Sequence, residues 1–179
     1  YKHITGRDFI MHTYSVQDMP QKEMAWPRQP SDRQWVKPEG DDPRTLYQML
    51  MVSQDRFGEE PCIGYIPGPG EPRKHLSYNQ FGDLATQVAK GLRNIGVEKG
   101  DRVAIIIDNS VQWAALSYGA NALGAAYTAM YTHQHGKDWA YIIADATPKV
   151  VAVANTEVLD KLCGALPADG SVSYTHLRA

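Results

Sequence analysis

The apolar residues in the middle of the chain follow a helix–strand–helix pattern. Over Tyr78–Ile95 they recur every three or four positions, which predicts an amphipathic helix that Gly96 ends. The next segment, Arg102–Ile107, is apolar at five successive positions, as is typical of a strand covered on both faces of a parallel sheet. Asp108–Ser110 then offers capping side chains for a second helix over Val111–Leu123.

The alternation of strands and helices continues downstream. Ala125–Tyr131 and Lys149–Ala154 are predicted strands, and Lys137–Ala144 and Glu157–Leu162 are predicted helices. This order predicts an α/β fold with a mostly parallel sheet, flanked by helices and joined by right-handed crossovers. The predicted helix over Val111–Leu123 has one side of small residues, which would allow close approach to the sheet. These residues are Ala115, Gly119 and Ala122.

A helix and a hairpin are predicted before this alternation. Thr45 is a suitable N-cap for a helix over Leu46–Phe57, and Gly58 is a suitable stop. In this helix one side collects apolar residues, namely Leu46, Met49, Leu50 and Phe57. Pro61–Tyr65 and Lys74–Ser77 read as the two strands of a hairpin around a turn rich in proline and glycine.

The two ends of the chain differ from its middle. Residues 1–44 are punctuated by prolines and are expected to form an extended arm, pinned to the domain by Trp26 and Trp35, or else a partly disordered leader. Residues 45–171 are expected to form the folded domain. Residues 172–179 resemble the translation of a transposase adapter used for sequencing libraries, so we expect a scar there and a natural protein that continues further.

Composition excludes several classes of protein. A net charge of −2 over 179 residues, with scattered basic side chains, gives no support for nucleic-acid binding. No apolar run is long enough for a transmembrane helix, and the first residues lack the apolar core of a signal peptide. Cys62 and Cys163 are expected to be small buried thiols in a reducing compartment. The expected location is intracellular, either cytoplasmic or peripheral to a membrane.

A search for catalytic motifs yields no candidate residue. Gly119 and Gly124 have the spacing of a phosphate loop but lack its Lys-Ser/Thr ending, so they read as packing glycines. The prolines around Gly68 would remove the amide donors that a phosphate loop needs. His133 and His135 are two imidazoles on an extended segment, whereas a metal site needs three or four ligands. We therefore predict no catalytic, cofactor-binding or metal-binding residue.

Five segments in order resemble one family. Thr45–Tyr65, Leu76–Phe81, Gly100–Ala104, Asn109–Trp113 and Leu123–Tyr127 are similar to the start of the large domain of AMP-forming acyl-CoA synthetases, the adenylate-forming superfamily. The likeness is strongest to the long-chain fatty acid type. The resemblance implies that this chain is part of the N-terminal lobe of that fold. Other adenylate-formers, such as aryl-CoA or acyl-carrier-protein ligases, and a non-enzymatic α/β binding module are the alternatives.

The resemblance also implies a reaction. Such ligases of fatty acid metabolism use ATP and Mg²⁺ to join a carboxylic acid to AMP and then transfer the acyl group to coenzyme A. The family's phosphate loop, Thr-Glu motif, ribose-binding Asp and C-terminal Lys would all follow the last residue of this chain. The chain alone is therefore expected to be inactive, to bind none of these cofactors tightly, and to aggregate through uncovered edges. For the parent enzyme, a fatty acid is the expected partner, and peripheral membrane association is left open.

Overall fold

The computed structural model describes residues 45–166 and 176–178. The expected N-terminal arm, with Trp26 and Trp35, falls outside these residues, and so does most of the expected scar. The boundaries drawn at residues 44 and 171 therefore stay predictions.

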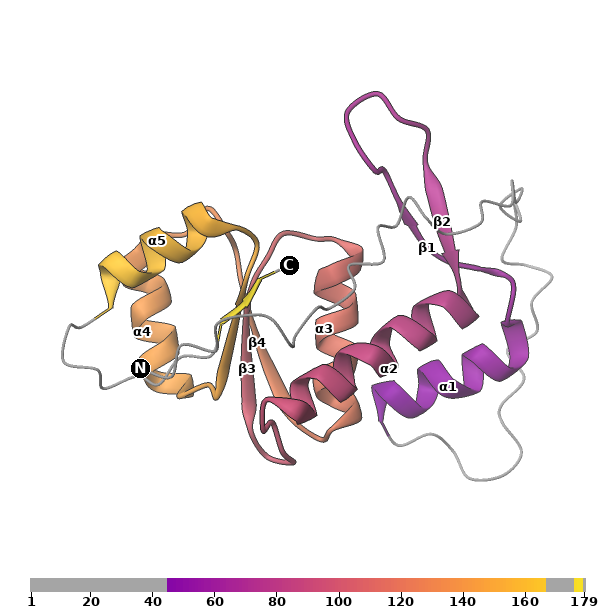
Figure 1. Cartoon of the computed structure of the whole chain (residues 1–179), viewed down its shortest axis with the longest axis horizontal. Coiled ribbons are helices and arrows are strands. Elements are labelled where there is room, and N and C mark those ends of the chain that lie inside the picture. Colours follow the sequence, from indigo (N-terminus) through magenta and orange to yellow (C-terminus); the bar gives the residue numbers. More distant parts are fainter. Residues whose placement is uncertain (1–44, 167–175, 179) are drawn as a thin grey trace.

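A four-stranded parallel sheet forms the centre of the described structure (Figure 1). Its strands are β3 (Arg102–Ile106), β4 (Ala126–Met130), β5 (Val150–Val153) and β6 (His176–Arg178), in the spatial order β4-β3-β5-β6. Every pairing is parallel, and Val103 of β3 lies opposite both Tyr127 of β4 and Val150 of β5. The predicted α/β class and parallel sheet are confirmed. β6 lies within the segment expected to be a scar, and that expectation stays a prediction.

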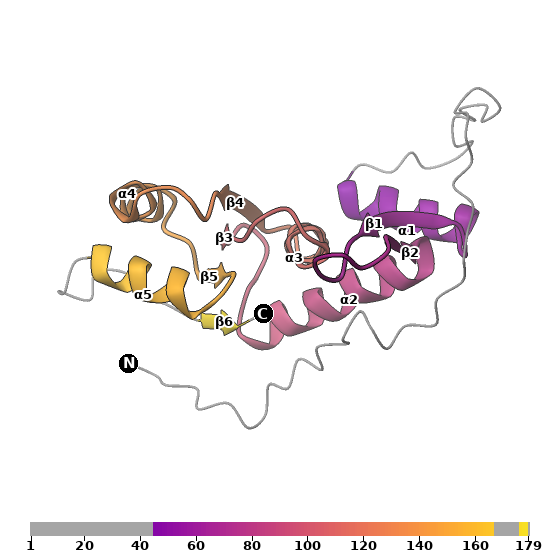
Figure 2. The same ribbon diagram turned by 90° about the horizontal axis from the view of Figure 1, so that it is seen from above.

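Helices cover both faces of the sheet (Figure 2). One face packs against α2 (Tyr78–Asn94) and α3 (Val111–Ala122), and the other packs against α4 (Gly136–Ala146) and α5 (Thr156–Ala165). Side chains of β3 alternate between the two cores, since Val103 and Ile105 enter the first and Ala104 and Ile106 enter the second. All four are buried, which explains why this strand has no polar side.

A capping box starts α2, the longest helix described. The Ser77 hydroxyl accepts from the Gln80 amide at 3.2 Å, and the Ser77 amide donates to Gln80 Oε1 at 2.9 Å. The apolar side of the helix then buries Phe81, Val88 and Leu92. The predicted helix is confirmed, and it ends one residue before the predicted end, with Ile95 as its C-cap.

Gly119, one of the small residues of α3, contacts α2, which corrects the expectation that this residue approaches the sheet. A Cβ placed on Gly119 would lie 2.7 Å from Val88 Cγ1 and 3.1 Å from the Ala89 amide nitrogen. Ala115 is buried in the same core, whereas Ala122 is only partly buried. Gly119 therefore sets the distance between two helices that lie on one face of the sheet.

The first helix and the hairpin pack at the outer side of α2 and α3 (Figure 1). α1 (Leu46–Phe57) begins at the predicted cap, where Thr45 Oγ1 accepts from the Gln48 amide at 3.1 Å. β1 (Pro61–Tyr65) and β2 (Lys74–Ser77) pair antiparallel as predicted.

The buried side of α1 differs from the predicted apolar side. Leu50 is buried, but Leu46 and Met49 are 49% and 51% exposed. The Tyr47 hydroxyl lies 2.9 Å from Thr86 Oγ1 of α2, so the side that carries Tyr47 and Leu50 faces the neighbouring helix. The buried side of α1 therefore includes a polar contact, which counting apolar positions does not reveal.

Candidate functional site

The carboxyl ends of β3 and β5 form the place where this fold would bind a ligand. These strands are neighbours, but β3 leads into α3 on one face of the sheet and β5 leads into α5 on the other. In open α/β sheets, ligands bind outside the carboxyl ends of strands at such a change of direction. The residues there are Asp108 and Asn109 after β3, and Ala154 and Asn155 after β5.

Two helix N-termini meet this carboxyl edge, and both are capped by the chain itself. Ser110 Oγ accepts from the Trp113 amide at 3.1 Å, and Asn155 Oδ1 accepts from the Val158 amide at 2.9 Å. These caps satisfy one free amide in the first turn of each helix. The two polar side chains thus have a structural role in starting α3 and α5.

The β4–α4 loop, defined here as Tyr131–His135, completes the carboxyl edge. Thr132 Oγ1 lies 2.6 Å from Asp108 Oδ1, so the loop is tied to the end of β3. The Tyr131 amide donates to Gln134 Oε1 at 3.0 Å, and the Gln134 amide donates back to the Tyr131 carbonyl at 3.2 Å. The edge therefore consists of a carboxylate, a hydroxyl and amide groups that bond to one another.

Among the described residues, the polar side chains at this edge cap helices or bond to one another. Asp108 is exposed and bonded to a hydroxyl, and no imidazole or thiol is bonded to it among the described residues. His133 and His135 are exposed, and the described part of the chain holds no cluster of three or more His, Cys, Asp or Glu residues suited to a metal ion.

The glycines that were considered as parts of a phosphate loop lie where helix packing or a turn of the backbone requires a small residue. Gly119 lies inside α3 against Val88, and Gly124 has φ +70° in the turn before β4. Gly68 accepts a hydrogen bond from the Glu71 amide at 3.1 Å inside the hairpin turn. None of these glycines lies between a strand and the N-terminus of the following helix, where a phosphate would bind.

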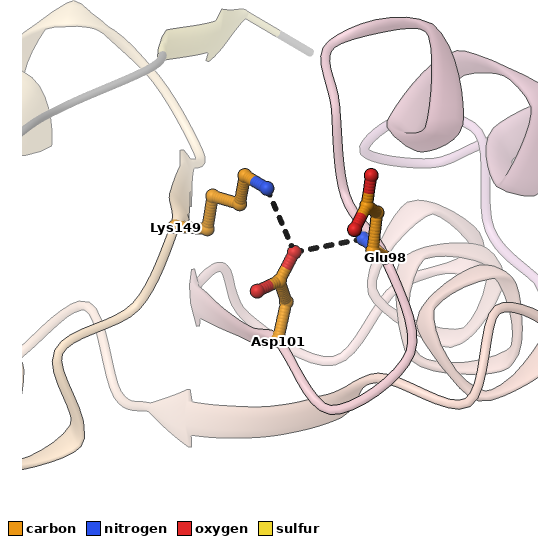
Figure 3. Close-up of polar contacts among 3 residues, drawn as sticks. All are labelled: Glu98, Asp101 and Lys149. Atoms are coloured by element: carbon orange, nitrogen blue, oxygen red, sulfur yellow. Dashed lines mark hydrogen bonds and ion pairs between the residues drawn. The ribbon is translucent and has the colours of Figure 1, made fainter.

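The opposite, amino edge of the sheet holds a polar cluster that joins β3 to β5 (Figure 3). Asp101 Oδ2 accepts from the Glu98 amide at 2.7 Å and lies 3.0 Å from Lys149 Nζ. The hydrogen bond from the Glu98 amide has the largest effect and the Lys149 ammonium the next largest. Together they hold the pKa of Asp101 below its usual value. Because this edge lies away from the expected ligand position, the cluster has a structural role.

Arg102 ties the turn before β5 to the same amino edge. Its Nε donates to the Ala146 carbonyl, and its Nη2 donates to Thr147 Oγ1 at 2.7 Å. Thr147 has φ +43°, a left-handed conformation that is unusual for a β-branched residue. The two hydrogen bonds from the Arg102 guanidinium therefore stabilise a turn in which the backbone of Thr147 is strained.

The two cysteines are separate free thiols in different environments. Cys62 is half-buried, and burial raises the pKa of its thiol to about 11. Cys163 is exposed on α5, which corrects the prediction that both thiols are buried.

The segments that carry the family resemblance have structural roles here. Leu76–Phe81 contains the capping box of α2, and Gly100–Ala104 forms the turn and the first half of β3. Asn109–Trp113 contains the cap of α3, and Leu123–Tyr127 contains the turn into β4. These motifs therefore identify a scaffold.

Two contacts at the carboxyl edge were missed by sequence reasoning. One is the Asp108–Thr132 hydrogen bond, and the other is the 2.7 Å hydrogen bond from Lys161 Nζ to the Gln134 carbonyl. Polar residues directly after two predicted strands were a usable signal for the first. The second had no sequence signal, because Lys161 on α5 lies 27 residues from Gln134, which belongs to the loop before α4.

Among the described helices, none combines the length and the apolar character needed to cross a bilayer.

Comparison with known proteins identifies the family. Residues 52–177 match the AMP-binding enzyme family. The chain is 32% identical over 121 residues to a long-chain-fatty-acid–CoA ligase of Bos taurus, covering 67% of this chain and 16% of that protein. It is 33% identical over 100 residues to a long-chain-fatty-acid–CoA ligase of Mycobacterium tuberculosis, covering 55% of this chain and 20% of that protein.

A solved structure agrees with this match. The N-terminal domain of FACL13 from Mycobacterium tuberculosis superposes with a TM-score of 0.66 at 28% identity, over 76% of this chain and 34% of that one. This chain thus spans about a sixth of the length of the Bos taurus relative and a third of the solved domain. The match to more than half of the chain and the shared fold show that this chain belongs to the AMP-binding enzyme family.

Proposed function

We propose that this chain is part of an ATP-dependent ligase that activates a long-chain fatty acid as its acyl-AMP and transfers the acyl group to coenzyme A. The observation that carries the proposal is the family match over residues 52–177, together with relatives named as long-chain-fatty-acid–CoA ligases. Carboxylate oxygen is a poor leaving group, and adenylation converts it into a good one. ATP, Mg²⁺ and coenzyme A are the cofactors of the whole enzyme.

The described residues contribute the scaffold of the N-terminal domain in this proposal. Their polar side chains at the carboxyl edge cap helices or bond to one another, as Ser110, Asn155 and Asp108 do. They include no glycine-rich strand-to-helix turn for a triphosphate, and no group of three or more His, Cys, Asp or Glu residues suited to a metal ion lies among them. We therefore assign none of the ligands of ATP, Mg²⁺ or coenzyme A to these residues.

The acyl chain is the feature that separates this proposal from an aryl-CoA ligase. Each buried methylene contributes about 0.8 kcal/mol to binding, so a tunnel for a long chain favours palmitate strongly over a small aromatic acid. The supporting relatives at 32% and 33% identity are both named for long-chain fatty acids.

The test uses the longest protein encoded by the gene that contains this chain in frame. Acyl-CoA formation is measured with palmitate, octanoate and benzoate at saturating ATP, Mg²⁺ and coenzyme A. We expect AMP release that depends on palmitate, with a kcat/KM at least about tenfold above that for benzoate. A preference for benzoate, or no AMP release with any of the three acids, would contradict the proposal.

A further inference from the structure

We propose that Lys161 is a positioning residue for the β4–α4 loop, and that it holds this loop in one shape at the ligand-binding edge of the enzyme. Lys161 lies on α5, on the second face of the sheet, and its side chain contacts the loop and α4. The ligand-binding part of this inference rests on the proposed function. Its structural part, the control of the loop by Lys161, stands on the contacts alone.

The Lys161 ammonium makes two contacts with the loop and its supporting helix. Its Nζ donates to the Gln134 carbonyl at 2.7 Å and lies 4.6 Å from the centre of the Trp139 ring. A charged donor strengthens the first contact, and the electron-rich ring face attracts the same charge in the second. One side chain thus binds the loop and the first turn of α4 at once.

Both partners of Lys161 are bonded to Tyr131, the first residue of the loop. Gln134 accepts the Tyr131 amide through its side chain and donates its own amide to the Tyr131 carbonyl. Trp139, which is fully buried, donates its indole N–H to the same carbonyl at 3.0 Å. Both residues that Lys161 contacts are therefore hydrogen-bonded to Tyr131, directly after the end of β4.

A close contact between α4 and α5 places Lys161 at the right distance. A Cβ on Gly136 would lie 2.8 Å from Ala165 Cβ and 3.3 Å from the Lys161 carbonyl. The start of α4 is therefore pressed against α5 beside Lys161. On the other side of the loop, Thr132 bonds to Asp108, so the position of the loop is fixed relative to β3.

Burial does not explain why this loop is so thoroughly bonded. Tyr131 is 74% exposed, and His133 is also exposed. Ordering a loop has an entropic cost, and little apolar burial of these two side chains offsets it. Loops held rigid on a scaffold while exposing polar and aromatic groups are typical of binding sites. The location beside the change of direction between β3 and β5 agrees with that role.

The structural part is tested by hydrogen–deuterium exchange on the whole 179-residue chain. In Lys161→Met, peptides covering residues 131–139 should exchange about fivefold faster, because a charge-assisted hydrogen bond and a ring contact are lost. Peptides covering residues 103–107 should not change. Lys161→Arg, which keeps the charge, should restore most of the protection.

The matched control is Lys90→Met. Lys90 is exposed on α2 and has no hydrogen bond or ion pair to a described residue, so its loss should leave the loop unchanged. Unchanged exchange at residues 131–139 in Lys161→Met would overturn the positioning role. So would an equal acceleration at residues 103–107, because it would show general destabilisation.

The ligand-binding part is tested in the longer ligase with the same three variants. Lys161→Met should raise the KM for ATP, palmitate or coenzyme A by about fivefold while kcat changes less than about twofold, and Lys161→Arg should recover it. A ligase with unchanged KM values and a looser loop would overturn the ligand-binding part only. A wild-type protein without ligase activity would refute the proposed function and leave the exchange result standing.

Discussion

Gly119 shows how one residue sets the distance between two helices. Sequence analysis identified it as part of a small-residue side, because small residues recur there at helical spacing. It assigned the sheet as the partner of this side, which was wrong for Gly119, since periodicity says which residues share a side and not which neighbour they face. The structure shows that the partner is Val88 of α2.

Replacing Gly119 by Ala should destabilise the chain by about 1–2 kcal/mol, because the new methyl group would overlap Val88. The free energy of unfolding from urea denaturation is the measurement. Gly164→Ala is the matched control, because Gly164 lies in α5 with open space around it and should gain up to about 1 kcal/mol from helix propensity.

A double variant tests whether overlap with Val88 is the cause of the destabilisation in Gly119→Ala. Val88→Ala removes the methyl groups that the new side chain at position 119 would meet, so the loss in Gly119→Ala should be smaller in the Val88→Ala background. Equal losses in both backgrounds would show that α3 does not depend on this contact.

The two thiols should differ in reactivity. The pKa of Cys62, raised to about 11 by burial, leaves almost no thiolate at pH 8, whereas Cys163 is exposed. A disulfide reagent at pH 8 should therefore label one thiol per folded chain quickly and the second only after denaturation. Fast labelling that persists in Cys163→Ser would contradict this assignment.

Elements were predicted more reliably than the way they pack. The helix over Leu46–Phe57 and both hairpin strands have their predicted bounds, since capping residues and breakers are local signals. The last helix was predicted as Glu157–Leu162 but runs over Thr156–Ala165, because Asn155 caps it one residue earlier. The exposed side of α1 was predicted wrongly, because the apolar count left out Tyr47, whose hydroxyl contacts Thr86 of α2.

The turn into β3 should make stability depend on pH through Asp101. Its pKa is lowered in the folded chain by the Glu98 amide and by Lys149. The Asp101 carboxylate therefore makes its full contribution to the free energy of unfolding above the pKa that it has in the unfolded chain, about 3.9. That contribution is lost as pH falls through its pKa in the folded chain. The difference in denaturation midpoint between wild type and Asp101→Asn should be constant from about pH 5 to 7 and shrink below about pH 4.

Asp145→Asn is the control for the loss of one carboxylate. Asp145 is exposed on α4, so this substitution should leave the denaturation midpoint at pH 7 almost unchanged. A wild-type advantage over Asp101→Asn that grows on acidification would have the wrong sign and would refute the role given to Asp101.

At the scale of the whole molecule, the sequence predicted the fold better than the site. The unbroken apolar run of Arg102–Ile107 was enough to predict a strand buried on both faces. The carboxyl edge depends on contacts between residues far apart in sequence. Thr132 reaches Asp108 across 24 positions, and Lys161 reaches Gln134 across 27. Such contacts cannot be predicted from the local pattern of apolar and polar residues.

The outer edge of β4 should promote association of the chain. Among the described residues, β4 pairs with β3 on one side and with no strand on the other. Unpaired strand edges template pairing between chains. Light scattering should therefore show association that increases with concentration, and Ala129→Lys, which adds a charge at an exposed position of β4, should reduce it.

A matched charge elsewhere tests whether the edge is responsible. Ala144→Lys adds the same charge at an exposed position of α4 and should leave association unchanged. Equal effects of the two substitutions would show that net charge, and not the edge of β4, controls association.

We propose that this chain forms part of the scaffold of an adenylate-forming ligase and supplies none of its adenylation chemistry. ATP–pyrophosphate exchange with palmitate and Mg²⁺, measured on the purified 179-residue chain beside the longer ligase, tests it most directly. We expect exchange at the protein-free background for the chain and well above it for the longer ligase. Palmitate-dependent exchange by the chain alone would contradict the proposal.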